Sequence, residues 1–167
     1  IYFIKISKMK KLIFIISMLF GVVYGQCPAS DTATMNAVTG IGSSSVTVTA
    51  TFPAGGTYRI RIIGTFNGII FTNGGDRLKM LNISQWGTDF RFGTTQTGYF
   101  YGCSNLTITA QDIPNLTGAT NLGNAFRACS MIRTIPRLNE WNMSGVTNLQ
   151  ATFQSCSLFN QDLNSWN

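Results

Sequence analysis

The sequence contains no histidine among its 167 residues, and charged residues make up only 11% of it. Histidine is the commonest general base and metal ligand, so its absence excludes a Cys–His nucleophile within this chain. Only six residues are acidic, whereas a glycosidase needs two carboxyl groups that face each other across a sugar. Asp112 and Glu140 are the pair that could approach, yet both lie near predicted turns, where solvated carboxylates are common. We therefore predict no catalytic residue, no metal site, no cofactor and a protein that is not an enzyme.

The positive charge of the chain does not indicate a nucleic-acid partner. The net charge is +6, from 12 basic and 6 acidic residues, but four of the lysines fall within residues 1–25. Without them, 8 basic residues stand against 6 acidic ones. The remaining arginines are too dispersed along the sequence to form the basic stripe that nucleic-acid binding requires. The sequence therefore predicts no nucleic-acid interface.

An apolar block, Leu12–Val23, follows a basic start near the N-terminus. Its residues would span roughly 18 Å as a helix, which is short of the ~30 Å hydrocarbon core of a bilayer. A basic N-terminal region, a short apolar stretch and small residues at its end are typical of a secretory signal peptide. A buried core helix is the alternative. We predict that residues 1–25 are a signal peptide, with residues 1–8 as an upstream extension before Met9 and cleavage near Gly25–Gln26.

Export would place the mature protein in an oxidising compartment, as a secreted or cell-surface protein. The chain has four cysteines. Cys27 follows the predicted cleavage point and could carry a lipid, although a lipobox requires a small residue where Gln26 stands. A membrane contact is therefore expected only through the signal peptide, or through an anchor beyond the given sequence.

A repeat of about 27 residues dominates the second half of the sequence. Shifted by that length, Gly118–Ser130 falls on Gly145–Ser157 with identical Gly, Thr, Asn, Leu, Phe, Cys and Ser positions. Phe100–Leu106 is an earlier, weaker copy, and Leu138–Trp141 matches Leu163–Trp166. Since units of this length cannot bury an apolar face alone, they are expected to stack on one another.

The spacing inside a unit predicts a helix and a strand. Val146, Leu149, Phe153 and Cys156 recur at helical spacing, and Ser144 stands where an N-cap is expected. The Leu-Asn-x-Trp segments are short enough to form one strand per unit. The predicted fold class is α+β: a short antiparallel β entry module followed by an α/β leucine-rich-repeat-like solenoid with one strand and one helix per 25–27-residue unit. The expected repeat core comprises Phe100, Cys103, Leu106, Leu122, Phe126, Cys129, Trp141, Val146, Leu149, Phe153, Cys156, Phe159, Leu163 and Trp166.

Cys103, Cys129 and Cys156 stand at one phase of the repeat. They could form a ladder of reduced, buried thiols, or disulfides between neighbouring units. Buried cysteine behaves as a small hydrophobe, and a disulfide needs Cβ atoms about 3.8 Å apart. Side chains at equivalent positions of stacked units point in the same direction and do not converge. The reduced ladder is therefore favoured, and a disulfide between neighbouring units remains the alternative.

The sequence divides into four segments. After residues 1–25, residues 26–45 are rich in Ser, Thr and Ala and are predicted to be a flexible arm, residues 46–92 a β-rich N-terminal capping module, and residues 93–167 a repeat array. In the capping module Val46–Phe52 and Tyr58–Ile62 alternate in polarity on either side of Pro53–Gly56, which predicts a hairpin. Because the last repeat motif stops without a cap, we expect the sequence to be a fragment of a longer array.

The pattern from Val146 to Asn167, Val-Thr-Asn-Leu-x-x-x-Phe-x-x-Cys-x-x-Phe-Asn-Gln-Asp-Leu-x-x-Trp-Asn, resembles the repeat of the BspA-like leucine-rich surface proteins of the DUF285 family. The resemblance extends over residues 57–167 and departs from the family pattern at Pro114 and at Arg133–Pro136. It implies an exported bacterial surface protein that mediates adhesion, or that binds a surface protein or a glycan. A structural stalk or spacer is the alternative, as is a secreted hydrolase whose catalytic domain lies beyond residue 167.

Overall fold

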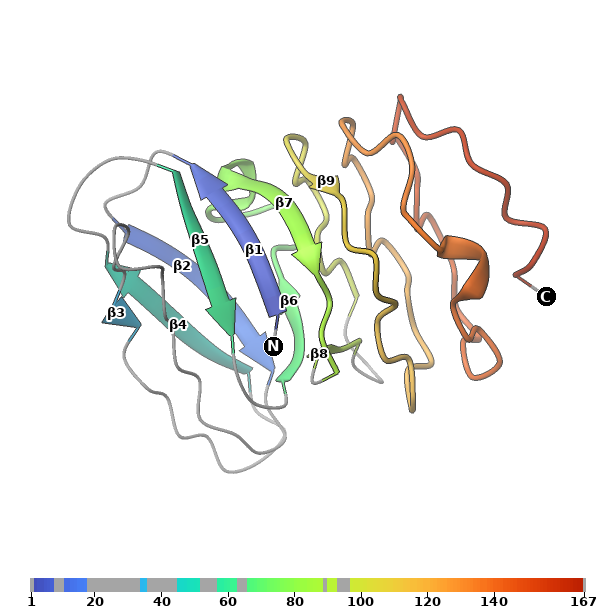
Figure 1. The fold of residues 1–167 in the computed structure, drawn as a ribbon, viewed down its shortest axis with the longest axis horizontal. Coiled ribbons are helices and arrows are strands. Elements are labelled where there is room, and N and C mark those ends of the chain that lie inside the picture. Colours follow the sequence, from blue (N-terminus) through green and yellow to red (C-terminus); the bar gives the residue numbers. More distant parts are fainter. Residues whose placement is uncertain are drawn as a thin grey trace.

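The computed structural model describes residues 2–7, 11–17, 34–35, 45–51, 57–62, 66–88, 90–92 and 97–166. Figure 1 shows strands gathered at one end of the molecule, from which irregular coils follow one another toward the C-terminal end. No described residue belongs to an α-helix, and none forms a helix that could cross a membrane. The elements of the described residues are β1 Tyr2–Ser7, β2 Lys11–Ser17, β3 Thr34–Met35, β4 Ser45–Thr51, β5 Thr57–Ile62, β6 Phe66–Ile70, the 3₁₀ helix η1 Arg77–Lys79, β7 Met80–Gln85, β8 Phe90–Arg91, β9 Thr107–Ile108 and the 3₁₀ helix η2 Leu138–Glu140.

The strands form two sheets, with the orders β5-β1-β7-β9 and β3-β4-β2-β6-β8. Most neighbours are antiparallel, but β7 with β9 and β6 with β8 run parallel. These parallel pairs form the edge of each sheet next to the coils, where Asn82 of β7 pairs with Thr107 of β9. The predicted entry module is therefore mixed rather than antiparallel, and its last strands lead directly into the repeat.

The two alternating segments of the capping module form strands but do not pair with each other. β4 pairs with β2 and β3, whereas β5 pairs with β1 in the other sheet. The predicted hairpin is therefore wrong, because alternation identifies a strand but does not choose its neighbour. Residues 53–56, predicted as the turn between them, lie outside the described residues, as do Cys27 and most of the predicted flexible arm.

Two strands lie within the predicted signal peptide. β1 lies between β5 and β7, and β2 lies between β4 and β6. The backbone register places Ile4 opposite Ile60 on one side and opposite Ile83 on the other. The uncleaved chain thus uses these residues in both sheets, although the sequence pattern predicted a signal peptide there. Cleavage of the segment stays a prediction.

Backbone hydrogen bonds join the successive coils of the repeat. The turn segments 98–103, 122–129 and 148–156 lie at equivalent positions in three coils. The N–H of Phe100 donates to the carbonyl of Ala125 at 2.8 Å, and the N–H of Phe126 donates to that of Thr152 at 3.0 Å. Each turn segment therefore stacks on the next, as Figure 1 shows for the yellow to red part of the chain.

The predicted helix between residues 146 and 156 is wrong. Within this segment the N–H of Cys156 donates to the carbonyl of Phe153 at 3.1 Å, three residues back, whereas an α-helix needs donation to the fourth residue back. Ala151 and Ser155 have φ angles of 56° and 62°, a left-handed conformation that interrupts a right-handed helix. Left-handed residues recur at every fourth position of all three turn segments: Gly98 and Gly102, Asn124 and Ala128, and Ala151 and Ser155.

This recurrence explains why the sequence pattern suggested a helix. Because a left-handed residue recurs at every fourth position, the backbone conformation repeats with a period close to that of an α-helix. Apolar side chains three and four residues apart therefore still share a face. The predicted Leu-Asn-x-Trp strand is also absent, since Leu138–Glu140 is the 3₁₀ helix η2. The hydroxyl of Ser144 does not cap a helix but donates to Asn142 Oδ1 at 2.7 Å. One strand and one helix per unit is therefore contradicted by the structure.

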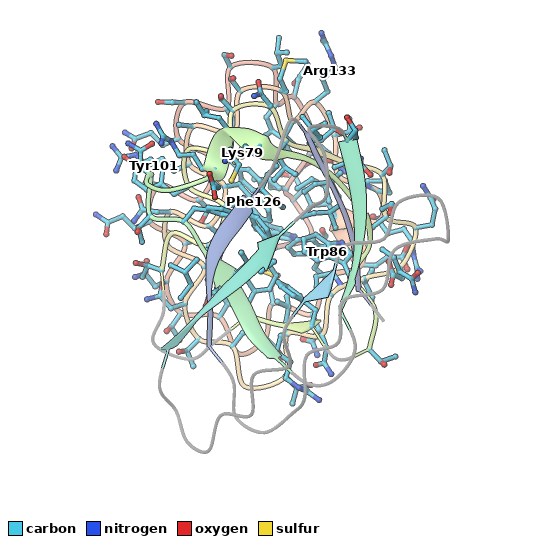
Figure 2. The ribbon with its side chains drawn as sticks, turned by 90° about the vertical axis from the view of Figure 1, so that its left-hand side faces the viewer. Lys79, Trp86, Tyr101, Phe126 and Arg133 are labelled. Atoms are coloured by element: carbon cyan, nitrogen blue, oxygen red, sulfur yellow. The ribbon has the colours of Figure 1, made fainter. Side chains whose placement is uncertain are left out.

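Aromatic rings fill the interior of the stack. The rings of Phe100 and Phe126 stack with centroids 5.6 Å apart, and those of Phe126 and Phe153 with centroids 5.5 Å apart. Trp86 packs edge-on against Trp141 at 5.8 Å. Figure 2 shows Phe126 and Trp86 in the interior and Arg133 at the periphery. The repeat thus places one aromatic ring of each coil over the next.

Candidate functional site

The three repeat cysteines are buried free thiols. The Sγ of Cys129 donates to the carbonyl of Phe100 at 3.0 Å, and the Sγ of Cys156 donates to the carbonyl of Phe126 at 2.9 Å. Each of these thiols therefore bonds to the backbone of the preceding coil. This arrangement is the ladder of reduced thiols that the repeat spacing favoured over disulfides.

Burial also raises the pKa values of these thiols. Desolvation raises the pKa of Cys103 and of Cys129 well above the ordinary thiol value, and the pKa of Cys156 is raised by the same cause. Since the thiolate is the nucleophile and the metal ligand, burial disfavours the reactive form of these cysteines. Within the described residues, no group of three or more His, Cys, Asp and Glu side chains could hold a metal ion.

The residues predicted as repeat core differ in burial along the stack. Phe100, Cys103, Leu106, Leu122, Phe126, Cys129, Trp141 and Cys156 are buried, and Val146, Phe153, Phe159, Leu163 and Trp166 are partly buried. Leu149 is 39% exposed, although its equivalent in the preceding coil, Leu122, is fully buried. The difference arises because segment 122–129 lies between two coils. Within the described residues, segment 148–156 has a neighbouring coil on one side only.

A groove crosses the edges of three successive coils. Its volume is about 730 Å³, which lies within the range of small-molecule sites. Apolar side chains contribute part of its lining, and amides, hydroxyls and two charged groups contribute the rest. The lining residues are Gln85, Gly87, Thr88, Asp112, Ile113, Pro114, Asn115, Leu116, Thr117, Arg137 and Asn142.

The charged groups in and beside the groove are already paired. The guanidinium of Arg137 donates to both carboxylate oxygens of Glu140, at 2.9 and 2.6 Å, and to the carbonyl of Gln111 at 3.1 Å. These hydrogen bonds lower the pKa of Glu140 and raise that of Arg137. The carboxylate of Asp112 accepts the backbone N–H groups of Trp86 and Gly87 at 2.9 and 2.6 Å.

These contacts give Asp112 and Glu140 distinct structural roles. The carboxylate of Asp112 holds the preceding coil through backbone donors, and that of Glu140 forms an ion pair on its own coil. A general acid in a glycosidase needs a raised pKa, whereas the pKa of Glu140 is lowered.

The groove was not predictable from the sequence. Its polar side chains come from three different coils and form no continuous motif along the chain. The only available signal was the equivalence of Asn115 and Asn142 within the repeat. Both side chains accept a backbone N–H two residues later, from Thr117 at 2.9 Å and from Ser144 at 3.1 Å. Equivalent asparagines therefore shape equivalent turns beside the groove.

Stacked, turn-rich coils with a groove along one edge define a repeat protein with a candidate binding site. Residues 94–167 match the family described as "Mycoplasma protein of unknown function, DUF285". This match supports the DUF285 family for the repeat segment, and the finer likeness to BspA-like proteins stays a prediction. No curated protein and no solved structure matches the chain.

Proposed function

We propose that this protein is an exported, non-enzymatic surface protein that binds a glycan or a protein through the groove of its repeat segment. The observation that carries the proposal is the groove itself, which extends over three coils and is lined by hydroxyls, amides and short apolar side chains. The DUF285 match over residues 94–167 and the signal-peptide pattern of residues 1–25 support a surface location.

The chemistry of the groove favours a neutral, hydroxyl-rich ligand such as a glycan. Arg137 is neutralised by Glu140, and the oxygens of Asp112 accept backbone donors, so neither side chain is a free ionic anchor. Asn142 and Thr117 are exposed, and their polar groups can exchange hydrogen bonds with sugar hydroxyls. Ile113 offers an apolar surface against the C–H groups of a sugar ring.

The groove proposal can be tested with two equivalent positions of the repeat. Thr117 lines the groove, whereas Ser144, its equivalent in the next coil, is exposed and does not line it. Thr117→Trp should fill the groove and abolish binding on an array of neutral glycans, whereas Ser144→Trp should leave binding unchanged. Equal binding by both variants would contradict the assignment of the groove. A wild-type chain that binds no glycan or surface protein would favour the stalk.

The surface location is tested separately, by the mature N-terminus and the accessibility of the protein on intact cells. Cleavage near Gly25–Gln26 would remove β1 and β2, so the exported protein would lack two strands of the uncleaved chain. Surface proteolysis and N-terminal sequencing should find a protein that begins at Gln26 and is digested on whole cells. A protein that retains residues 1–25 and resists digestion would refute export without deciding whether the groove binds a ligand.

A further inference from the structure

Two arginine side chains that are far apart in the sequence meet at one edge of the stack. The side chain of Arg77 lies across the backbone of Gly102, where a Cβ would be 2.6 Å from Arg77 Cδ and 2.9 Å from its Nε. The N–H of Gly102 donates to the carbonyl of Arg127 in the next coil at 2.8 Å. The guanidinium of Arg127 lies over the ring of Tyr101, with its Cζ 5.1 Å from the ring centroid. The two arginines therefore approach segment 98–103 from either side.

No carboxylate neutralises these two arginines. The ion pair closest to them in the sequence joins Lys79 to Asp76. Among the residues that the structure describes, neither Arg77 nor Arg127 forms an ion pair with a carboxylate. The Nη1 of Arg127 donates instead to the neutral amide oxygen of Asn124 at 3.2 Å. Because both arginines are partly exposed, their guanidinium groups are available to an anionic ligand.

Polar side chains continue the same edge along the stack. The N–H of Asn73 donates to the carbonyl of Tyr101 at 3.0 Å, and the N–H of Ala128 donates to that of Gln154 at 2.8 Å. Asn73, Tyr101, Arg127 and Gln154 therefore occupy equivalent positions of successive coils, and Asn73 and Gln154 are exposed. Since hydrogen-bonded neighbours lie about 4.8 Å apart, this row extends over roughly 14 Å. Its length suits an extended chain better than a single small anion.

We propose that this edge, formed by Asn73, Arg77, Tyr101, Arg127 and Gln154 and here called the basic edge, binds an acidic glycan. The two guanidinium groups would bind carboxylate or sulfate groups of the sugar chain. The two amide side chains would exchange hydrogen bonds with its hydroxyl groups. None of the five residues lines the groove, so the basic edge is a second site with a different class of ligand.

The composition of the basic edge favours a glycan over a nucleic acid. The guanidinium of Arg127 covers one face of the Tyr101 ring, which reduces the surface left for stacking of a base. Two arginines also provide few phosphate contacts, whereas affinity for nucleic acids depends on many of them. Amide side chains beside the arginines are suited to the hydroxyl groups that a sugar presents at every residue.

The proposal is tested by titrating the full chain at physiological salt with a heparin oligosaccharide, a hyaluronan oligosaccharide and neutral dextran. Arg77→Gln and Arg127→Gln each remove one positive charge and should weaken binding of the acidic glycans by at least roughly tenfold. Arg133→Gln is the matched control, because it removes the same charge from a residue that lies apart from Tyr101 in Figure 2. It should leave the affinity almost unchanged, and dextran should not compete.

A second pair of variants tests the position of Arg77 without changing any charge. Gly102→Ala places a methyl group where the side chain of Arg77 lies, so it should displace that arginine and weaken binding of the heparin oligosaccharide. Gly118 has a similar φ of 78°, and within the described residues no atom lies within 4 Å of an added Cβ. Gly118→Ala should therefore introduce comparable backbone strain and leave binding unchanged.

Three results would overturn the proposal: a wild-type chain that binds neither acidic glycan, an equal loss of affinity in Arg133→Gln and Arg127→Gln, and tighter binding of single-stranded DNA that both arginine variants abolish. Thr117→Trp keeps this test separate from that of the groove, because Thr117 lines the groove and is not part of the basic edge. That variant should bind the heparin oligosaccharide as the wild type does, whether or not the groove binds a neutral glycan.

Discussion

Replacing Ala128 with glycine distinguishes the observed turns from the helix that the sequence pattern suggests. Ala128 has a φ of 58°, and the left-handed conformation costs a residue with a Cβ about 1–2 kcal/mol. Glycine avoids that cost but loses about 0.5–1 kcal/mol through the greater freedom of the unfolded chain. Ala128→Gly should therefore stabilise the protein by about 0.5–1 kcal/mol. In a helix interior the same change would destabilise it by about the same amount.

The assay is urea unfolding followed by tryptophan fluorescence, with Ala125→Gly as the matched control. Ala125 lies three residues earlier in the same segment, is fully buried, and is not among the residues with positive φ. Its replacement should destabilise the protein by about 1–2 kcal/mol, through the lost methyl group and the greater freedom of the unfolded chain. A loss of stability in Ala128→Gly similar to that in Ala125→Gly would refute the left-handed assignment.

Three further predictions follow from the stack, and each can be measured by denaturation. Phe126→Ala should lower the free energy of unfolding by about 3–5 kcal/mol, because the Phe126 ring is fully buried between two other rings. Phe153→Ala should lower it by roughly half as much, because the Phe153 ring is only half-buried. Equal losses in the two variants would contradict this difference in burial. Because burial raises the pKa of Cys129 and Cys156, the free energy of unfolding should be highest below the ordinary thiol pKa and should decline as the pH rises above it. Alkylation of Cys129 in the folded protein should be slower than alkylation of Cys156. Rapid alkylation of folded Cys129 would argue against its burial. Asp112→Ala should cost about 1–3 kcal/mol because two backbone N–H groups lose their acceptor, and an unchanged unfolding midpoint would show that these hydrogen bonds contribute nothing.

The N-terminal region shows how far alternation of polarity can predict structure. The alternating segments near residues 46–52 and 58–62 were expected to be strands, and β4 and β5 are found there. Their partners were not predictable, because β4 and β5 pair with strands from the segment interpreted as a signal peptide. Local polarity acts on each segment separately, whereas pairing depends on which distant strands are present.

Repetition in the sequence by itself determined that equivalent residues would occupy equivalent positions in successive coils. Phe100, Phe126 and Phe153 therefore form one aromatic column, and the cysteines form another set of equivalent side chains. Only the tertiary structure decided that the coils are built from turns. The N–H groups of alternate residues find better-placed acceptors on the next coil than four residues back, and that choice depends on a neighbour that no local sequence pattern contains. The groove was likewise decided by the tertiary structure, because its residues meet only after three coils have stacked.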